Sequence, residues 1–258
     1  MPTSNPRQRG VVLAAVLLGA VGVLGAVLLP TSASPGSLLA GPPRGEGRHG
    51  AEFRVAGDGS IPTSAPRLRA PNEPLSSAER GYAIGLARDA MAADAQDVVG
   101  EPGGEVLTTE LPPLAERSTA RLVSVAVYDY TADQLHQLLV DLTAGSVQRD
   151  ETVEGLQLPP TAAETAISMD LAMKADPEPA FAREYERSTG NPLLTPAQVH
   201  AVAGVWRPAY PSATTELATA VCGQHRCVQL LIALPTGQYL DTQDFAVDLS
   251  THSVLRTQ

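Results

Sequence analysis

Hydrophobic and polar positions divide the chain into four stretches that differ in character. An uninterrupted apolar run occupies residues 11–29, and a stretch dense in Pro, Gly and small polar residues follows over residues 34–73. Such a stretch buries too little apolar surface to offset the entropy lost on ordering, so we expect a flexible linker there. Two stretches with periodic patterns, residues 74–156 and 157–258, complete the chain, and we expect each of them to fold.

Capping-box patterns predict where the first helix of each periodic stretch begins. Ser76 with Glu79, and Thr161 with Glu164, have the Ser/Thr-x-x-Glu spacing. In that motif the two side chains satisfy backbone N–H groups at a helix N-terminus. The predicted helices cover residues 76–99, 161–174 and 180–188.

Alternating apolar residues bounded by Gly, Pro or polar turns predict strands after the helices. In the first stretch they cover residues 105–111, 121–130, 134–142 and 146–152. In the second they cover residues 198–206, 215–222, 226–234 and 244–250. Helical segments followed by hairpin-connected strands, twice over, favour an α+β fold with antiparallel sheets.

The two periodic stretches look like copies of one unit. Residues 140–149 and 247–256 agree at six of ten positions, at an offset of 107. At the same offset Val123, Val125 and Val127 fall on Leu230, Ile232 and Leu234. Strand side chains alternate between two faces, so this agreement keeps the same buried face in both copies. We therefore predict two repeats, each with a helix packed on an antiparallel sheet.

The net charge narrows the classes of partner. The chain has 18 Lys and Arg residues against 28 Asp and Glu residues, a net charge of −10. Such a surface repels phosphate backbones and anionic lipid headgroups, so nucleic acid is not expected as a partner.

The N-terminus has the features of an export signal. Arg7 and Arg9 precede the apolar run, and small residues end it near Ala33. As a helix the run spans about 28 Å, close to a bilayer core, so residues 1–33 fit a cleaved signal peptide and a membrane anchor equally. Either way the positive flank places the rest outside the cytoplasm, and the membrane is contacted only by residues 11–29. Arginine supplies 17 of the 18 basic side chains, which is typical of GC-rich bacteria and indicates a bacterial cell envelope protein.

A resemblance to a known family rests on two segments. Residues 122–149 form an alternating strand, a short turn and a strand ending in Val-Asp-Leu-Thr-Ala-Gly-Ser-Val, and they resemble the small N-terminal domains of copper amine oxidases. Residues 161–176 resemble the helix that opens the next such domain. The resemblance covers about residues 74–258 and implies cystatin-like domains, each with one helix across a curled antiparallel sheet. PepSY domains share the same strand–turn–strand pattern.

The family's chemistry does not come with this resemblance. In copper amine oxidases a large separate β domain binds copper through three histidines and forms a quinone from a Tyr that follows an Asn. In this chain no Tyr follows an Asn, and no His-x-His occurs. A metal site needs three or four converging donors, and the histidines are scattered: His49, His136, His200, His225 and His252. We therefore expect no catalytic, cofactor-binding or metal-binding residue and no enzyme activity.

Three polar side chains in the predicted strands are further candidates for a functional role. Asp141 and Asp248 occupy the same place in each copy and resemble a carboxylate pair. Their parity is opposite to that of the apolar face, so we expect solvent-facing residues that bond local backbone amides at a strand end. His136 shares the parity of the apolar face, which predicts a half-buried position at the edge of the core.

Two features suggest contact with other proteins. Residues 200–204, His-Ala-Val-Ala-Gly, resemble the Gln-x-Val-x-Gly hairpin by which cystatins block thiol proteases, with His in place of Gln. A buried strand is the alternative explanation of this run. Trp206 is the only Trp and lies near Tyr210. It is expected to plug the core at a sheet edge, and the alternative is an exposed contact patch formed by Trp206 and Tyr210.

The cysteines predict a disulfide bond. Cys222 and Cys227 are the only two, and a short polar turn separates them between strand-like residues. They are therefore expected at the feet of a hairpin, about 4.5 Å apart at Cα and within disulfide range. An oxidising compartment would keep the bond closed. A metal clip formed with His225 is the alternative, but it lacks a fourth ligand.

These observations predict a non-catalytic interaction or accessory module of the cell envelope. Its partner is an unidentified envelope protein or a second copy of the chain. A purely structural domain or a protease-inhibitor-like binder is the alternative, and an amine oxidase-related enzyme is the least favoured.

Overall fold

The computed structural model describes residues 64–117, 119–175, 179–208 and 219–257. The predicted apolar segment, most of the predicted linker and Tyr210 lie outside these residues. The described residues belong to one compact unit. None of their helices is long and apolar enough to cross a membrane.

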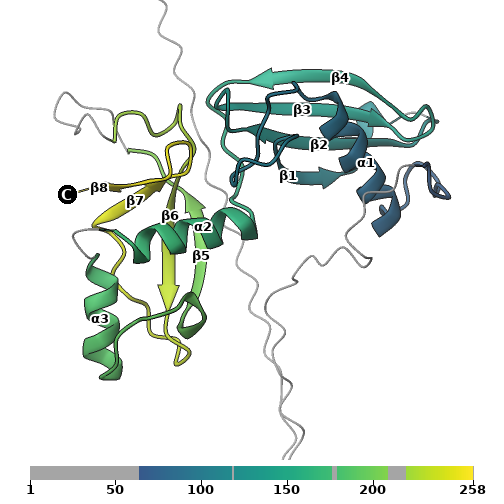
Figure 1. The fold of residues 1–258 in the computed structure, drawn as a ribbon. Coiled ribbons are helices and arrows are strands. Elements are labelled where there is room, and N and C mark those ends of the chain that lie inside the picture. The colour runs from purple at the N-terminus through teal and green to yellow at the C-terminus, as the bar shows by residue number, and fades with distance from the viewer. Residues whose placement is uncertain (1–63, 118, 176–178, 209–218, 258) are drawn as a thin grey trace, which may run out of the picture. The chain divides into compact units, whose positions relative to one another are not determined.

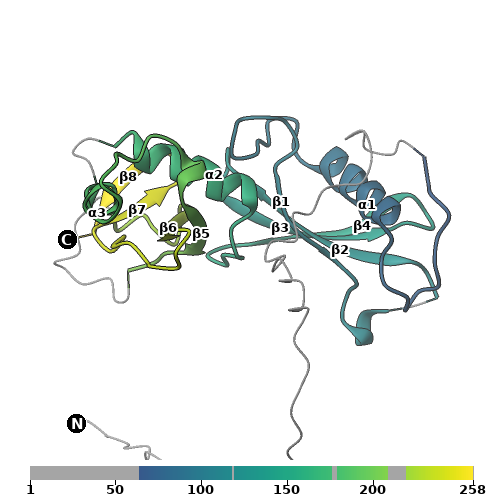
Figure 2. The same cartoon turned by 90° about the horizontal axis from the view of Figure 1, so that it is seen from below.

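The fold consists of two four-stranded antiparallel sheets, each with a helix packed on one face (Figures 1 and 2). The first repeat contains α1 (Ser77–Ala90), β1 (Glu105–Glu110), η1 (Leu114–Glu116), β2 (Leu122–Asp129), β3 (Gln134–Asp141) and β4 (Ser146–Val153). The second contains α2 (Ala162–Met173), α3 (Ala180–Thr189), η2 (Pro196–Gln198), β5 (His200–Val205), β6 (Cys227–Ala233), β7 (Phe245–Asp248) and β8 (Ser253–Arg256). The strand orders are β1-β2-β3-β4 and β5-β6-β7-β8, so the α+β class is confirmed.

Both predicted capping boxes form. The Ser76 hydroxyl accepts from Glu79 N at 3.2 Å, and Glu79 Oε2 accepts from Ser76 N at 2.8 Å. In the second repeat Thr161 Oγ1 accepts from Glu164 N at 3.0 Å, and Glu164 Oε2 accepts from Thr161 N at 2.6 Å. These bonds satisfy N–H groups that no helical carbonyl can reach.

The first helix is shorter than predicted and ends at Ala90. Met91 has an extended backbone with a ψ of 160°, and farther along the Asp97 side chain forms a turn with the backbone that follows it. Asp97 Oδ1 accepts from Val99 N at 3.0 Å and from Glu101 N at 2.9 Å. Asp side chains that bond their own backbone favour turns over helix.

The strand faces follow the predicted alternation. Val123, Val125 and Val127 are fully buried under α1, with Leu138 and Val140 of the neighbouring strand. Small residues on α1, including Ala83 and Ala87, let the helix lie close to the sheet. In the second repeat Val228, Leu230 and Ile232 form the equivalent row beneath α2.

The pairing corrects the predicted offset for one strand. Leu122 pairs with Asp141, and Cys227 pairs with Asp248, so β2 and β6 correspond at an offset of 105. The following strands, β3 and β7, correspond at 107, because the connection from β6 to β7 is two residues longer. Both offsets are odd, so the buried face is the same under either alignment.

Two strand predictions need correction. Residues 219–222 of the predicted strand 215–222 form turns, and Cys222 makes only an isolated bridge with His225. Strand β8 was not predicted separately, although it pairs with β7 as β4 pairs with β3.

Candidate functional site

Strand β5 forms an edge of the second sheet with unpaired backbone groups. Trp206 N donates to Cys227 O at 2.9 Å, which fixes the phase of the β5–β6 ladder. The N–H and C=O groups of Ala201, Ala203 and Val205 therefore point away from β6. Within the described part of the chain these groups have no hydrogen-bond partner on that side. The edge can accept another strand.

The other three edges of the two sheets carry features that block strand addition. Strand β1 has Glu at both ends and a register shift between Val106 and Thr108. Strand β4 presents the consecutive charges Arg149, Asp150 and Glu151, and β8 is only four residues long. Strand β5 is uncharged apart from the titratable His200, and it has neither proline nor a register shift. Charges, bulges and short strands are the usual protection of sheet edges, and β5 lacks all three.

The outer face of the second sheet carries exposed apolar side chains beside this edge. Val202 is 59% exposed, Leu231 is 47% exposed and Tyr239 is 63% exposed. They line a hollow of about 510 Å³ whose only charged side chain is Asp241. A smaller hollow of about 260 Å³ on the first repeat is lined by four charged residues: Glu110, Glu116, Arg149 and Glu151.

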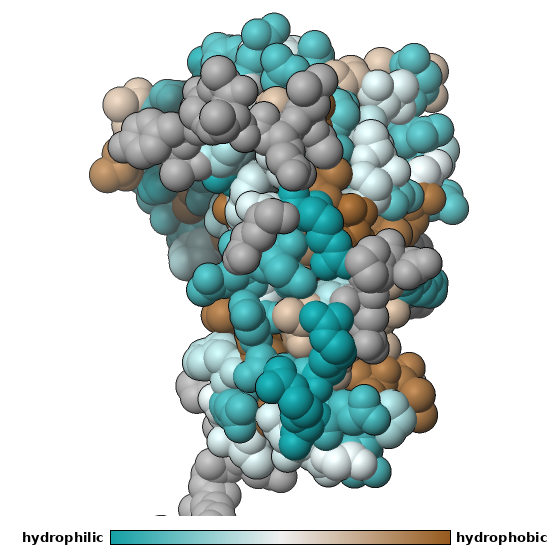
Figure 3. All heavy atoms as spheres, turned by 90° about the vertical axis from the view of Figure 1, so that its left-hand side faces the viewer, coloured by the Kyte–Doolittle hydropathy of each residue, from teal (hydrophilic) through white to brown (hydrophobic). Residues whose placement is uncertain are grey.

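Figure 3 views the molecule from the side of the second repeat. On that side hydrophobic residues reach the surface in small groups among hydrophilic ones. Small apolar groups are normal on soluble proteins, so the feature specific to this sheet is the combination of an open edge with an apolar hollow.

Two of the features singled out for contact, Trp206 and the segment 200–204, lie in β5 or directly after it. Trp206 is half-buried directly after β5, and Tyr210 lies outside the described residues. The segment 200–204 forms β5 itself and pairs with β6, so it is not the tip of a hairpin. The exposed apolar residues Val202, Leu231 and Tyr239 were not predicted, although Val202 belongs to the run that was.

A buried Arg–Glu pair, which the sequence reading missed, recurs in both repeats. In the first, Arg121 Nε donates to Glu79 Oε1 at 2.8 Å and Arg121 Nη2 donates to Glu79 Oε2 at 3.1 Å. Nη1 of Arg121 also donates to three carbonyls of the segment before α1, including Ala70 O at 2.7 Å. Burial alone raises the pKa of Glu79, but bonds from Arg121 and nearby amides outweigh it and lower the pKa to about 2.

The second repeat contains the same pair with additional partners. Arg226 donates to both oxygens of Glu164 and to Leu158 O at 3.1 Å. Tyr130 of the first repeat donates to Glu164 Oε1 at 2.6 Å. Burial, followed by the Glu164 charge, raises the pKa of Tyr130 far above its ordinary range, so the phenol stays protonated. The Arg226 guanidinium carbon also lies 5.3 Å from the Tyr128 ring centre.

Cys222 and Cys227 form a disulfide bond, with their Cα atoms 5.3 Å apart. The predicted hairpin setting is wrong, because Cys222 lies in a turn and only Cys227 belongs to a strand. Both sulfurs are engaged in this bond, whereas the alternative metal clip with His225 would need both as free ligands.

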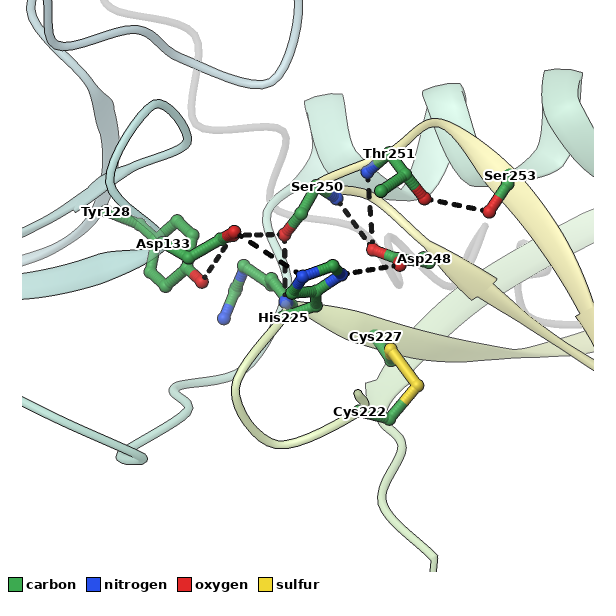
Figure 4. The surroundings of a disulfide bond; sticks show 10 residues. Tyr128, Asp133, Cys222, His225, Cys227, Asp248, Ser250, Thr251 and Ser253 are labelled. Carbon is green, nitrogen blue, oxygen red and sulfur yellow. Dashed lines mark hydrogen bonds and ion pairs between the residues drawn. A yellow bond between two sulfur atoms is a disulfide. The ribbon is translucent and has the colours of Figure 1, made fainter. Parts of the chain in front are cut away.

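His225, inside the disulfide-closed loop, contacts two carboxylates (Figure 4). Its Nδ1 lies 2.8 Å from Asp248 Oδ2, and its Nε2 lies 3.9 Å from Asp133 Oδ2. The hydrogen bond to Asp248 raises the pKa of His225; burial opposes this shift, and the two negative charges add to it. Ser250 donates to Asp133, and His225 Nε2 faces Asp133, so these residues are not arranged as a nucleophile with its base.

Asp141 and Asp248 act on local backbone amides as predicted, but they are buried. Asp141 Oδ1 accepts from Thr143 N at 2.8 Å, and Asp248 Oδ1 accepts from Ser250 N at 3.0 Å. The turns that follow cover these carboxylates, which is why strand parity alone misplaced them. They lie in separate sheets and do not form a carboxylate pair.

His136 is half-buried, as predicted, and its Nδ1 lies 3.0 Å from Asp150 Oδ1. In the described ranges no three His, Cys, Asp or Glu side chains are grouped in a way that could hold a metal ion.

Comparison with known proteins gives structural similarities but no match in sequence. No family model and no curated protein matches the chain in sequence. Among solved structures, the chain is similar to a copper-containing benzylamine oxidase from Hansenula polymorpha, with 14% sequence identity and a TM-score of 0.41. The match covers 73% of this chain and 30% of the oxidase. This chain therefore matches less than a third of that oxidase, at an identity from which no copper-site or quinone residue is transferred.

Proposed function

We propose that the chain is a binding module of the bacterial cell envelope, without an activity of its own, that takes an extended segment of another envelope protein alongside β5. The open, unprotected edge of β5 is the observation that carries this proposal. A partner strand would bond the outward N–H and C=O groups of Ala201, Ala203 and Val205. Strand addition of this kind supplies affinity through main-chain hydrogen bonds and specificity through side-chain pockets.

The apolar hollow supports the same function. Alternate side chains of an added strand would lie over the outer face, beside Val202, Leu231 and Tyr239. With one charged residue in its lining, the hollow fits uncharged side chains. The net charge of −10 disfavours polyanionic partners.

Export and duplication belong to the same proposal. The apolar run 11–29 would serve as a signal peptide or an anchor and place the folded part outside the cytoplasm. The recurring Arg–Glu pairs and Asp turns support an origin from two copies of a cystatin-like unit. The protease-inhibitor alternative loses its main support, because its motif lies within β5 and not at a hairpin tip.

Site-specific photo-crosslinking tests the binding surface. Benzoylphenylalanine replaces Tyr239 in the full chain, which is exported from living cells, and the matched control carries it at Leu114, which is 75% exposed in the first repeat. We expect an adduct of defined mass at position 239, none at position 114, and loss of the adduct when Val202→Lys is added. Equal adducts at both positions, or none at 239, would contradict the proposal. An adduct of twice the chain's mass would show that the occupant is a second copy instead.

A further inference from the structure

We propose that the loop closed by the Cys222–Cys227 disulfide is a clamp between the two repeats, which loosens when the disulfide is reduced and when His225 loses its proton. The clamp is separate from the β5 surface and does not depend on its function. It rests on which side chains the loop carries and what they contact in the first repeat.

The loop supplies two adjacent side chains that reach the first repeat. His225 approaches Asp133, in the turn between β2 and β3, at 3.9 Å. Arg226 packs over the ring of Tyr128 in β2. The two residues are consecutive and both lie between the two cysteines, so one covalent ring holds both contacts. Figure 4 shows His225 of this ring facing Asp133.

Asp133 is the residue of the first repeat whose carboxylate both His225 and Ser250 approach. It accepts from the Ser250 hydroxyl of the second repeat and from Tyr128 Oη at 3.2 Å. Its φ of +53° is unusual for a residue other than glycine. The structure therefore holds the Asp133 carboxylate toward the second repeat in a sparsely populated backbone conformation.

The disulfide determines how firmly the loop is held at its N-terminal end. Cys227 begins β6 and is anchored by the sheet, whereas Cys222 lies in a turn. Turn bonds such as that from His225 N to Val221 O at 2.9 Å are the local support of residues 221–225. Breaking the sulfur–sulfur bond would leave the N-terminal end of the loop held by these turn bonds alone. Arg121 is the counterpart of Arg226 in the first repeat, and no cysteines flank it. The first repeat therefore has no disulfide-closed loop at the equivalent position.

The redox step needs a dithiol reductant. The reductant supplies two electrons and two protons, the bond between Cys222 and Cys227 breaks, and both become thiols. The reductant leaves as its own cyclic disulfide. Other contacts between the repeats persist, including Thr161 Oγ1 to Glu105 Oε1 at 2.8 Å and His252 Nε2 to Val98 O at 2.8 Å. Reduction therefore loosens the junction without separating the repeats.

The pH dependence follows from the groups that face His225. Asp248 on β7 and Asp133 on the β2–β3 turn are the two carboxylates, and Arg226 is the cationic neighbour, whose guanidinium is turned to Glu164. The phenol of Tyr128 bonds Asp133 and stays protonated, because burial raises the pKa of Tyr128. Protonated His225 attracts both carboxylates, whereas neutral His225 can keep its hydrogen bond to Asp248 but loses the charge attraction to Asp133. The raised pKa means that the clamp is complete below about pH 6.5 and weakens as the pH rises through the folded-state pKa.

Hydrogen exchange of the full chain, oxidised and reduced at one pH, tests the clamp. The readout is the segment 129–134 of the first repeat, which contains no cysteine. We expect reduction by a small dithiol to speed exchange there by roughly fivefold, the effect of losing one partly exposed ion pair. Exchange that changes only within residues 219–228 would overturn the proposal.

Variants separate the clamp from a general loss of stability. Asp133→Asn should speed exchange in 129–134 with the disulfide intact and should reduce the further effect of reduction. After correction for intrinsic rates, His225→Asn should abolish the change in 129–134 between pH 5.5 and pH 8. His136→Asn is the matched control, since His136 pairs with Asp150 within the first repeat, and it should retain that change. Equal behaviour of the two histidine variants would count against the pH arm of the clamp.

Discussion

Replacing Glu79 with Gln gives a direct measure of the buried Arg–Glu pair. Both side chains are almost fully buried, and Glu79 also accepts bonds from the Ser76 and Arg69 amides. Glu79→Gln leaves the Arg121 charge without its carboxylate. Breaking a buried pair costs about 3–5 kcal/mol, and because Gln keeps one acceptor oxygen we expect the lower end of that range at pH 7.

The pH dependence of the difference in unfolding free energy between wild type and Glu79→Gln is the more specific part of the prediction. The pKa of Glu79 is lowered from 4.5 to about 2. A lowered carboxylate pKa contributes stability that is present above the unfolded-state pKa and lost as the pH falls towards the folded-state value. Because the folded and unfolded states then bind different numbers of protons, lowering the pH from 7 to 3 should reduce the unfolding free energy of wild type by about 2 kcal/mol relative to Glu79→Gln. The difference in unfolding free energy between wild type and Glu79→Gln should narrow to about 1 kcal/mol at pH 3.

Urea unfolding of the full chain, followed by circular dichroism at several pH values, measures this difference. Glu73→Gln is the control: it removes a nearby carboxylate that accepts only an exposed bond from Ala70 N, and it should change stability by less than about 0.5 kcal/mol throughout. A difference for Glu79→Gln that stays constant from pH 7 to pH 3 would refute the reasoning. It would mean that the carboxylate is not held ionised by Arg121.

Four further results are expected. The double variant Cys222→Ala with Cys227→Ala should lose roughly 2 kcal/mol, because a loop of six residues has little closure entropy; an unchanged melting temperature would contradict this. Gly104→Ala should destabilise by about 1–3 kcal/mol, since its Cβ would lie 2.6 Å from Val127 Cγ1 at a φ of +75°. Gly100→Ala, at a φ of +87° with no atom within 4 Å of the new Cβ, should cost only about 1 kcal/mol in a denaturation series. The purified chain supplied with copper and a primary amine should release no hydrogen peroxide, and release that chelation abolishes would show oxidase activity.

The sequence was sufficient for the elements whose signals are local. The capping boxes at Ser76 and Thr161 predicted where two helices begin, because the bonds that cap a helix lie within four residues. Strand alternation identified the buried rows of both sheets, because parity survives an error of two residues in the offset. The similarity between residues 140–149 and 247–256 also predicts β8, because residues 146–149 lie in β4 and correspond to residues 253–256.

The remaining features depend on contacts between distant residues. Arg121 and Glu79 are 42 positions apart, and nothing in either local pattern shows that they meet. The shared placement offered a weak signal, since Arg121 directly precedes β2 and Arg226 directly precedes β6. The exposure of Val202 also depended on sheet order. A Val/Ala/Gly run predicts a strand, but only the topology shows that this strand lies at an edge.

The differences between the two repeats indicate where function lies. Both need a buried Arg to neutralise the capping-box Glu and a buried Asp to close the strand turn, so these shared features are explained by folding. An uncharged edge and an apolar hollow have no such explanation, because exposing them costs solubility and invites aggregation. The first repeat avoids that cost with charges on β1 and β4, which shows that the fold tolerates protected edges. The second repeat keeps the edge of β5 open although the first repeat protects both of its edges, and the proposed binding at β5 would account for this asymmetry.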